Sequence, residues 1–236
     1  MKNPKKNAKG FKKKKNTKPT DVGKFKNASN SYLEIKALEL IQSKQYDDAI
    51  NIYEDLINRN CKNPIIYSNL ASLYWTREKL TKARLLLNKA LKINPEYPEA
   101  LNNLGLIYKK EGEVKNAISL FKKAISLKTD YSEAYNNLGS IYFSQTRYEE
   151  AIKFFRNSLK YNISFRNASI NLSKSLNNLG VQQKEKGLLV NAQSSFKESI
   201  ELSNDYPDPY NNLGTTYVIK GDDEKAIKCF NAAIKI

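Results

Sequence analysis

Residues 101–124 read LNNLGLIYKKEGEVKNAISLFKKA, and this stretch returns twice with the same key residues in the same order. Residues 135–158 read YNNLGSIYFSQTRYEEAIKFFRNS, and residues 210–233 read YNNLGTTYVIKGDDEKAIKCFNAA. An alanine in the second half of each copy marks the period, and it stands at Ala49, Ala83, Ala117, Ala151, Ala192 and Ala226. The interval between successive alanines is constant except from Ala151 to Ala192, where it is longer by seven. The chain is therefore built from a repeat of about 34 residues with one insertion.

Each repeat has the apolar spacing of two consecutive helices. Apolar and small residues spaced i, i+3, i+4 and i+7 form one helical face, and Gly112 interrupts the pattern before a second face begins. The first face is Leu101, Leu104, Gly105 and Tyr108, and the second is Ala117, Phe121 and Ala124. One helical hairpin cannot bury its apolar stripe alone, so neighbouring hairpins are expected to stack into a solenoid. We expect Gly105 and Ala117 to let two helix backbones approach closely.

These residues and their spacing resemble the tetratricopeptide repeat (TPR), a helix–turn–helix unit with the same period. The resemblance implies an all-α fold, a right-handed α-solenoid of about six units. The predicted organisation is a disordered, Lys-rich basic tail at 1–29, followed by units at 30–63, 64–97, 98–131, 132–165, 173–206 and 207–236, with the insertion at 166–172. Because seven residues make about two helical turns, the insertion can lengthen a helix without changing its inward face.

The charge of the chain is concentrated near its start. The chain has 236 residues and a formal net charge of +16, of which residues 1–27 carry +10 through eleven lysines and one acid, Asp21. Such a segment has almost nothing to bury and is predicted to be disordered. A basic arm of this kind weakly suggests binding to nucleic acid or an anionic membrane. The competing interpretation is a solubilising tail in a chain that is rich in lysine throughout.

The sequence offers few groups for catalysis. It contains no histidine, and its two cysteines, Cys61 and Cys229, lie in units far apart. No Gly-rich phosphate loop is present, because the glycines of the repeats stand singly at structural positions. We therefore predict no catalytic residues, no cofactor and no metal site, and hence no enzyme. Two unpaired thiols and the lack of a signal peptide or a membrane-length apolar stretch favour a cytoplasmic location.

A row of asparagines is the most specific indication of a binding site in the sequence. One asparagine precedes the Leu-Gly or Leu-Ala step in five of the six units, at Asn69, Asn103, Asn137, Asn178 and Asn212, whereas the first unit has Ile35 there. A carboxamide offers both donors and an acceptor, so a row of them can hold an extended peptide backbone whatever its side chains. The row is similar to the asparagine ladder in TPR arrays of O-linked GlcNAc transferases, and this resemblance implies that it lines the concave groove. The alternative is that asparagine is merely a tolerated polar residue in an Asn-rich chain.

Two aromatic residues are further candidates for the groove. Trp75 and Phe143 share repeat position 12 with Lys109, and Trp75 is either an aromatic anchor for a ligand or a packing residue. The basic carboxylate clamp of chaperone-binding TPR domains is missing. Its positions hold Ser68, Asn102, Asn136 and Asn177.

The sequence therefore predicts a non-catalytic scaffold that binds extended segments of other proteins in a concave groove. One alternative is the substrate-presenting part of a glycosyltransferase-like enzyme whose catalytic domain is not in this chain. Another is a basic-tailed adaptor that associates with RNA or a membrane. The apolar stripe of the last helix has one neighbour to pack on and contains Ala226, Ile227, Phe230, Ala233 and Ile234. Three interpretations are open: a partner such as a second copy of the chain covers it, the chain is a piece of a longer protein, or the last hairpin is frayed.

Overall fold

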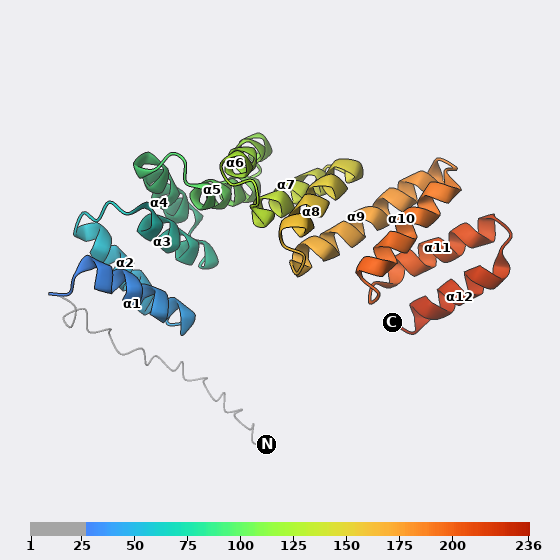
Figure 1. The fold of residues 1–236 in the computed structure, drawn as a ribbon, viewed down its shortest axis with the longest axis horizontal. Coiled ribbons are helices and arrows are strands. Elements are labelled where there is room, and N and C mark those ends of the chain that lie inside the picture. The colour runs from blue at the N-terminus through green and yellow to red at the C-terminus, as the bar shows by residue number, and fades with distance from the viewer. Residues whose placement is uncertain (1–26) are drawn as a thin grey trace, which may run out of the picture. The chain divides into compact units, whose positions relative to one another are not determined.

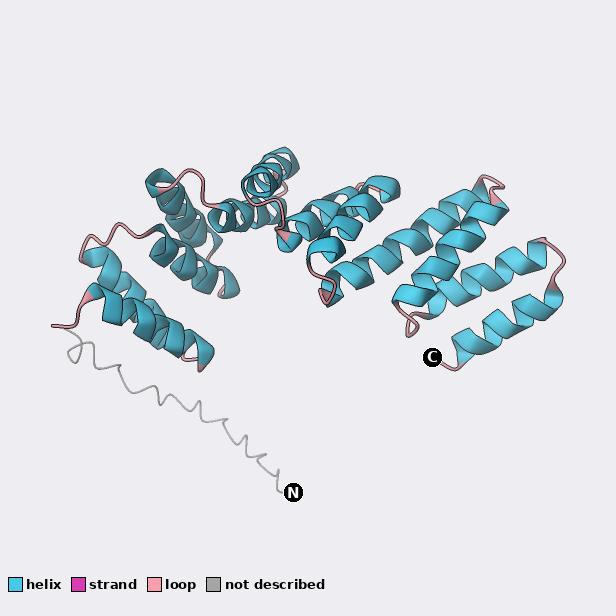
Figure 2. Ribbon diagram, in the orientation of Figure 1, coloured by secondary structure: helices cyan, strands magenta, loops and turns pink. Residues whose placement is uncertain are grey.

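The computed structural model describes residues 27–236, and within this range every regular element is an α-helix (Figure 2). The all-α class is thus confirmed. Most of the basic tail predicted at 1–29 lies outside the described residues. The chain divides after Cys61 into two compact bodies. We call residues 27–61 the N-terminal body and residues 62–236 the C-terminal body.

The N-terminal body is a single helical hairpin formed by α1 (Asn30–Gln42) and α2 (Tyr46–Asn58). Ser29 caps α1, because its hydroxyl oxygen accepts a hydrogen bond from the backbone N–H of Tyr32 at 3.2 Å. The backbone oxygen of Ala28 accepts from the guanidinium of Arg59 at 2.7 Å. Both ends of the hairpin are therefore tied to the segment that leads into it.

The C-terminal body contains ten helices, which Figure 1 shows following one another as hairpins. They are α3 (Pro64–Thr76), α4 (Leu80–Ile93), α5 (Pro98–Lys110), α6 (Val114–Leu127), α7 (Ser132–Ser144), α8 (Tyr148–Tyr161), α9 (Arg166–Glu185), α10 (Leu189–Leu202), α11 (Pro207–Ile219) and α12 (Asp223–Ile234). Helices α3, α5 and α11 each begin with a proline in the first turn. Proline is tolerated there because the backbone N–H that it lacks would have no acceptor within the helix.

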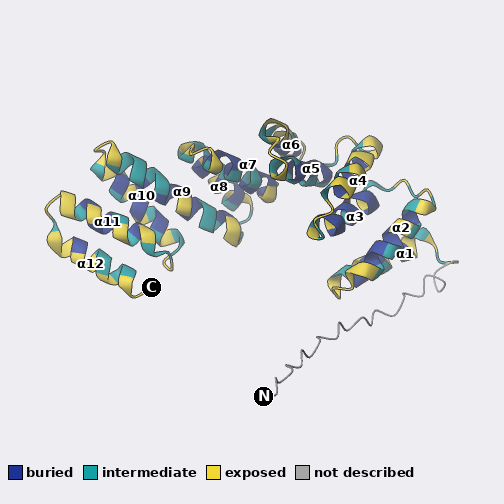
Figure 3. Cartoon of the chain, turned by 180° about the vertical axis from the view of Figure 1, so that it is seen from behind, coloured by how far each residue is buried: buried dark blue, intermediate teal, exposed yellow. Residues whose placement is uncertain are grey.

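The hairpins of the C-terminal body are stacked in two layers. The first helix of each hairpin, from α3 to α11, contacts the first helix of the next hairpin, and the second helix packs between consecutive first helices. Figure 3 shows buried residues gathered where these helices face one another. A cluster that joins α6, α7, α8 and α9 contains the fully buried rings of Phe121 and Phe155. The core therefore continues from hairpin to hairpin, as expected for a repeat architecture.

The glycine of each Leu-Gly step makes room for a phenylalanine ring. A Cβ atom at Gly105 would lie 2.7 Å from Cε1 of Phe121, and one at Gly139 would lie 2.8 Å from Cε1 of Phe155. The expectation that Gly105 serves a backbone-to-backbone approach is therefore wrong. The ring of the second helix occupies that space, because only a residue without a side chain leaves enough room for it.

The insertion coincides with the longest helix. Helix α9 has 20 residues, whereas α3, α5, α7 and α11 have 13 each. Ala168, Leu172 and Leu176 are all buried along it, so its added turns keep one apolar face toward the core. This face is maintained because seven residues are close to two full turns.

A left-handed residue ends the first helix of each hairpin. Gly112, Gly187 and Gly221 have φ of 82°, 77° and 74°, and Glu78 and Thr146 adopt φ of 58° at the equivalent positions. Backbone N–H groups there return to the last carbonyls of the helix, for example from Thr146 to Phe143 at 3.0 Å. A β-branched residue is strained in this conformation, whereas glycine is not.

Thr146→Gly is therefore expected to raise the free energy of unfolding by up to about 1 kcal/mol. The left-handed conformation costs a non-glycine residue about 1–2 kcal/mol, and the extra unfolded-state freedom of glycine offsets part of that gain. Urea denaturation followed by circular dichroism measures the change. The reciprocal variant Gly112→Thr is the matched control and should be less stable than the wild type. Equal stability of Thr146→Gly and the wild type would contradict the assignment of strain to this turn.

Candidate functional site

The predicted asparagine row crosses the first helices of the C-terminal body. Its members Asn69, Asn103, Asn137, Asn178 and Asn212 lie on α3, α5, α7, α9 and α11 in that order. All five are partly exposed. Because each of these helices contacts the next, the row passes from helix to helix across one layer.

Buried asparagines on the preceding helices hold part of the row. Nδ2 of Asn137 donates a hydrogen bond to Oδ1 of Asn102 over 2.9 Å. The same bond, again 2.9 Å long, joins Asn171 to Asn136 and Asn212 to Asn177. The acceptors Asn102, Asn136 and Asn177 are all buried, and we call them the supporting asparagines. They lie at the positions compared above with the basic carboxylate clamp of chaperone-binding domains. Each orients a carboxamide on the first helix of the next hairpin.

Helix α9 contributes two asparagines to the row. The carboxamide that pairs with Asn136 belongs to Asn171, which the row predicted from the sequence leaves out, whereas Asn178 lies beside Asn177. Asn171 stands one repeat length after Asn137, so counting the period forward through the insertion finds it. Asn178 stands one repeat length before Asn212 and satisfies the count backward. Both counts hold because the inserted residues are helical. We include Asn171 in the asparagine row from here on.

The carboxamides of the row keep free hydrogen-bonding capacity. A carboxamide has two N–H donors and an oxygen acceptor. Asn137, Asn171 and Asn212 each use one donor on a supporting asparagine, and their Oδ1 atoms have no hydrogen-bond partner among the described residues. Each therefore presents one N–H and one carbonyl oxygen in a fixed orientation. That pair matches the C=O and N–H of a peptide unit.

Trp75 and Asn103 line the same small pocket. It has a volume of about 40 Å³ and lies among α3, α4 and α5, with Ser72, Leu87 and Leu106 in its walls. Nδ2 of Asn103 donates to the hydroxyl of Ser72 at 3.3 Å. Nζ of Lys110 lies 5.3 Å from the centre of the Trp75 ring, within cation–π range. The indole is half-buried and is thus neither a core residue nor fully solvated.

Phe143 is placed differently from Trp75. It packs partly against the core, and its ring is tilted against Tyr148 of α8 with 5.6 Å between the ring centres. Lys109, at the same repeat position, has a pKa below its ordinary value because burial disfavours its charged form. The structure therefore brings Trp75 together with a member of the asparagine row. It places Phe143 in a contact within its own hairpin.

Asn137→Ala is expected to lower the free energy of unfolding by about 0.5–1.5 kcal/mol, the net value of one hydrogen bond. The carboxamide that would be removed is partly exposed, so water can take its place beside the buried oxygen of Asn102. Thermal or urea denaturation measures the loss. Asn178→Ala is the matched control, because Asn178 donates to no supporting asparagine and only accepts a longer bond of 3.4 Å from Asn177, so it should change stability less. Equal losses in the two variants would contradict the support assigned to Asn102.

The described residues offer no constellation for metal chemistry. No group of three or more Cys, Asp or Glu residues in residues 27–236 could hold a metal ion. Cys61 and Cys229 are both free thiols. Among the described helices, none has the length and apolar character needed to cross a membrane.

The last helix exposes apolar side chains. Ala226 is the one buried residue of α12, whereas Ile227 and Ile234 are 58% and 82% exposed. Self-association through this face, one of the interpretations that the sequence leaves open, stays a prediction.

The stacked hairpins define an α-helical repeat protein, and the sequence matches agree. Models described as tetratricopeptide repeat match residues 96–160, 130–205 and 207–236, and one described as TPR repeat matches residues 76–112. Together these matches cover more than half of the chain. The chain belongs to the tetratricopeptide repeat family. No curated protein matches it significantly over its sequence.

Several solved structures share this architecture. YrrB, described as a TPR protein with an unusual peptide-binding site, is 24% identical, with a TM-score of 0.61 over 78% of this chain and 91% of its own. A MamA protein is 26% identical, with a TM-score of 0.57 over 73% of this chain and 90% of its own. A TPR protein from Parabacteroides merdae is 17% identical, with a TM-score of 0.60 over 87% of this chain and 79% of its own. At these identities the likeness to YrrB and to the Parabacteroides protein concerns the fold alone.

Proposed function

We propose that the chain is a non-catalytic scaffold that holds extended segments of other proteins along its asparagine row. The observation that carries the proposal is the set of three equal hydrogen bonds, each 2.9 Å long, from the row to the supporting asparagines. A tolerated surface asparagine has no need of a buried partner. An asparagine that must present its carboxamide in one orientation does.

The spacing of the row suits an extended peptide. Neighbouring packed helices lie about 8–10 Å apart, and an extended chain advances about 3.3 Å per residue. One row member therefore meets roughly every third peptide residue. Asn171 and Asn178 are seven residues apart on α9, which is about 10 Å along a helix, so the interval is kept where the row turns along the helix axis. From Asn103 to Asn212 the row would engage about 12 peptide residues.

Membership of the TPR family supports protein binding as the general role. The reported peptide-binding site of YrrB is consistent with this role, although the proposal rests on the asparagines and not on that likeness. A cytoplasmic location belongs to the same proposal, supported by two cysteines that both remain thiols. The absence of an enzymatic role is likewise proposed, because the groups gathered along the row hydrogen-bond and hold no nucleophile or base.

Selection from a synthetic library of random 12-residue peptides, with both ends blocked, tests the proposal on the full chain. The peptide that binds best is then made again with a single N-methyl group at each position in turn. Methylation removes one backbone N–H, so binding should weaken by about twofold to tenfold at positions about three residues apart. Replacing most side chains by alanine should matter much less. Binding that ignores N-methylation but disappears with side-chain changes would overturn recognition through the backbone.

A further inference from the structure

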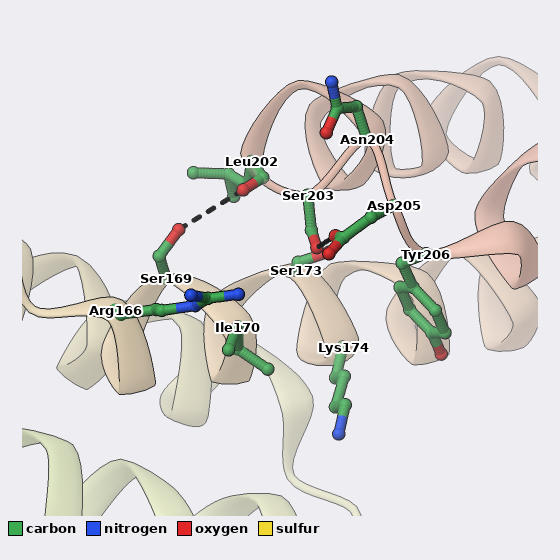
Figure 4. Close-up of a pocket in the computed structure, with 10 residues that line it drawn as sticks. All are labelled: Arg166, Ser169, Ile170, Ser173, Lys174, Leu202, Ser203, Asn204, Asp205 and Tyr206. Atoms are coloured by element: carbon green, nitrogen blue, oxygen red, sulfur yellow. Dashed lines mark hydrogen bonds between the residues drawn. The ribbon is translucent and has the colours of Figure 1, made fainter. Parts of the chain in front are cut away.

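We propose that a pocket beside α9 selects an acidic side chain from the peptide held on the asparagine row. This inference rests on the proposed function and adds a sequence preference to it. The pocket has a volume of about 390 Å³ and lies between α9 and the turn that follows α10 (Figure 4). Its walls come from α9 through Arg166, Ser169, Ile170, Ser173 and Lys174, and from the turn through Leu202, Ser203, Asn204, Asp205 and Tyr206.

The pocket is a product of the insertion. Ser173 stands one repeat length before Pro207, the first residue of α11. In α9, Ser173 is therefore the position where the first helix of the other hairpins begins, and the residues from Arg166 to Leu172 are an extension at the N-terminal end of the helix. Ser173 is fully buried there and bonds to the backbone oxygen of Ser199 at 2.9 Å. The two turns before it extend past the point where the turn after α10 packs on the helix. Arg166, Ser169 and Ile170 therefore form a wall that the shorter first helices of the other hairpins lack.

The charge of the pocket is unusual for its place in the repeat. The first turns of α5, α7 and α11 contain an acidic residue, which is Glu99, Glu133 and Asp208 in that order. Glu99 forms an ion pair at 3.0 Å with Lys128, the residue that caps the C-terminal end of α6. Lys174 stands one repeat length before Asp208, so the fifth repeat has a cation where these three repeats have an acid.

The two cations of the pocket form no direct ion pair. No carboxylate among residues 27–236 is bridged to Lys174 or Arg166, although Arg166 interacts electrostatically with Asp205. The one carboxylate in the lining, Asp205, accepts from the hydroxyl of Ser203 at 2.6 Å, and this bond, with help from Arg166, lowers its pKa. The lining thus carries two positive charges against one negative charge. This excess favours an anionic group in the pocket.

The pocket borders the asparagine row. Lys174 lies three residues after Asn171 and four before Asn178, so it is on the stretch of α9 between two row members. The hydroxyl of Tyr206 accepts from Nδ2 of the supporting Asn177 at 3.4 Å. Burial and the neighbouring carboxylate of Asp208 raise the pKa of Tyr206 to about 12, so the phenol stays neutral. Figure 4 shows Ile170, Lys174 and Tyr206 pointing to one side, whereas Asn204 points to the other.

The chemistry of the lining favours a carboxylate on a short apolar stem. Ile170 and Leu202 offer apolar contact, and the Lys174 ammonium and the Arg166 guanidinium offer charged donors. A glutamate or aspartate of the bound segment provides both parts. A phosphorylated side chain shares the anionic chemistry, and the test separates it from the carboxylate.

The test repeats the random-peptide selection with the full chain in three forms. These are the wild type, Lys174→Glu, and Lys153→Glu, the last being an exposed lysine on α8 that receives the same charge change. The wild type and the Lys153→Glu control should enrich Asp or Glu at least fivefold at one fixed position of the peptide. Lys174→Glu should lose the enrichment there while it keeps binding peptides. Circular dichroism verifies that all three forms fold.

A second arm uses the selected peptide itself. Changing its acidic residue to Gln should weaken binding to the wild type at least fivefold, whereas it should not weaken binding to Lys174→Glu, where it removes a like-charge repulsion. Peptides that bind the wild type without any acidic preference, or equal loss in the two lysine variants, would overturn the pocket and leave the scaffold function standing. If no peptide is selected at all, the scaffold function itself fails. If a phosphoserine peptide binds and the glutamate peptide does not, the carboxylate assignment is wrong.

Discussion

Phe155→Ala is expected to lower the free energy of unfolding by about 3–5 kcal/mol. The ring of Phe155 is fully buried in the cluster that joins α6 to α9, and it rests on the bare Cα of Gly139. Its removal loses the burial of the largest fully buried side chain of its hairpin and leaves a cavity. Neighbouring hairpins share this cluster, so the loss should affect the stacking on both sides.

Chemical denaturation followed by circular dichroism measures this loss, with Phe143→Ala as the matched control. Phe143 is half-exposed, so its removal should cost clearly less. A second check uses Gly139→Ala. In the wild type the new Cβ meets the ring at 2.8 Å and should destabilise the protein, whereas without the ring the helix preference of alanine should stabilise it by about 1 kcal/mol. An equal effect of Gly139→Ala in both backgrounds would show that ring and glycine are not coupled.

The architecture can be predicted from the sequence because the same spacing of apolar and small residues recurs in successive repeats. The spacing of Leu101, Leu104, Gly105 and Tyr108 predicts a helix whose apolar face must meet a second helix, and the structure places α6 against α5. What single-helix patterns could not reveal is which atom fills the space at Gly105. Whether a facing backbone or the Phe121 ring occupies it depends on the packing of two helices.

Asn171 was missed for a different reason. The repeat count was anchored on alanines of the second helices, and the alanine after the insertion moved the expected row member to Asn178. Because the inserted residues are helical, α9 contains one row member for each neighbour. Asn171 is in register with α7, and Asn178 is in register with α11. The supporting asparagines stand at the same sequence separation from their partners in all three pairs, so the regularity is present in the sequence. Its meaning becomes visible only when two helices are side by side.

The pocket beside α9 could not be predicted from the sequence. It depends on where the turn at residues 202–206 packs along a helix that is longer than its neighbours. The reversal of charge at Lys174 is readable from the aligned repeats. The lack of a carboxylate partner for it is a property of the folded chain.

Asn103→Ala combined with Asn178→Ala is expected to weaken peptide binding roughly fivefold to a hundredfold. Two lost hydrogen-bonding positions at about 0.5–1.5 kcal/mol each give about 1–3 kcal/mol. These two members suit the test because neither donates to a supporting asparagine. From the supporting asparagine beside it, each only accepts a long hydrogen bond, 3.5 Å from Asn102 to Asn103 and 3.4 Å from Asn177 to Asn178, so the folded chain loses less when they are removed. The buried oxygens of Asn102, Asn136 and Asn177 keep their partners.

Fluorescence anisotropy with a labelled, library-selected peptide measures the affinity of the full chain. The matched control is Asn88→Ala with Asn191→Ala, which removes two exposed carboxamides from the second helices α4 and α10. The control should bind like the wild type. The loss should also be similar for peptides of unrelated sequence, because each removed carboxamide contacts main chain and not side chains. If the row and control variants bind equally well, the asparagines do not hold the peptide, and their orientation by the supporting asparagines serves packing alone.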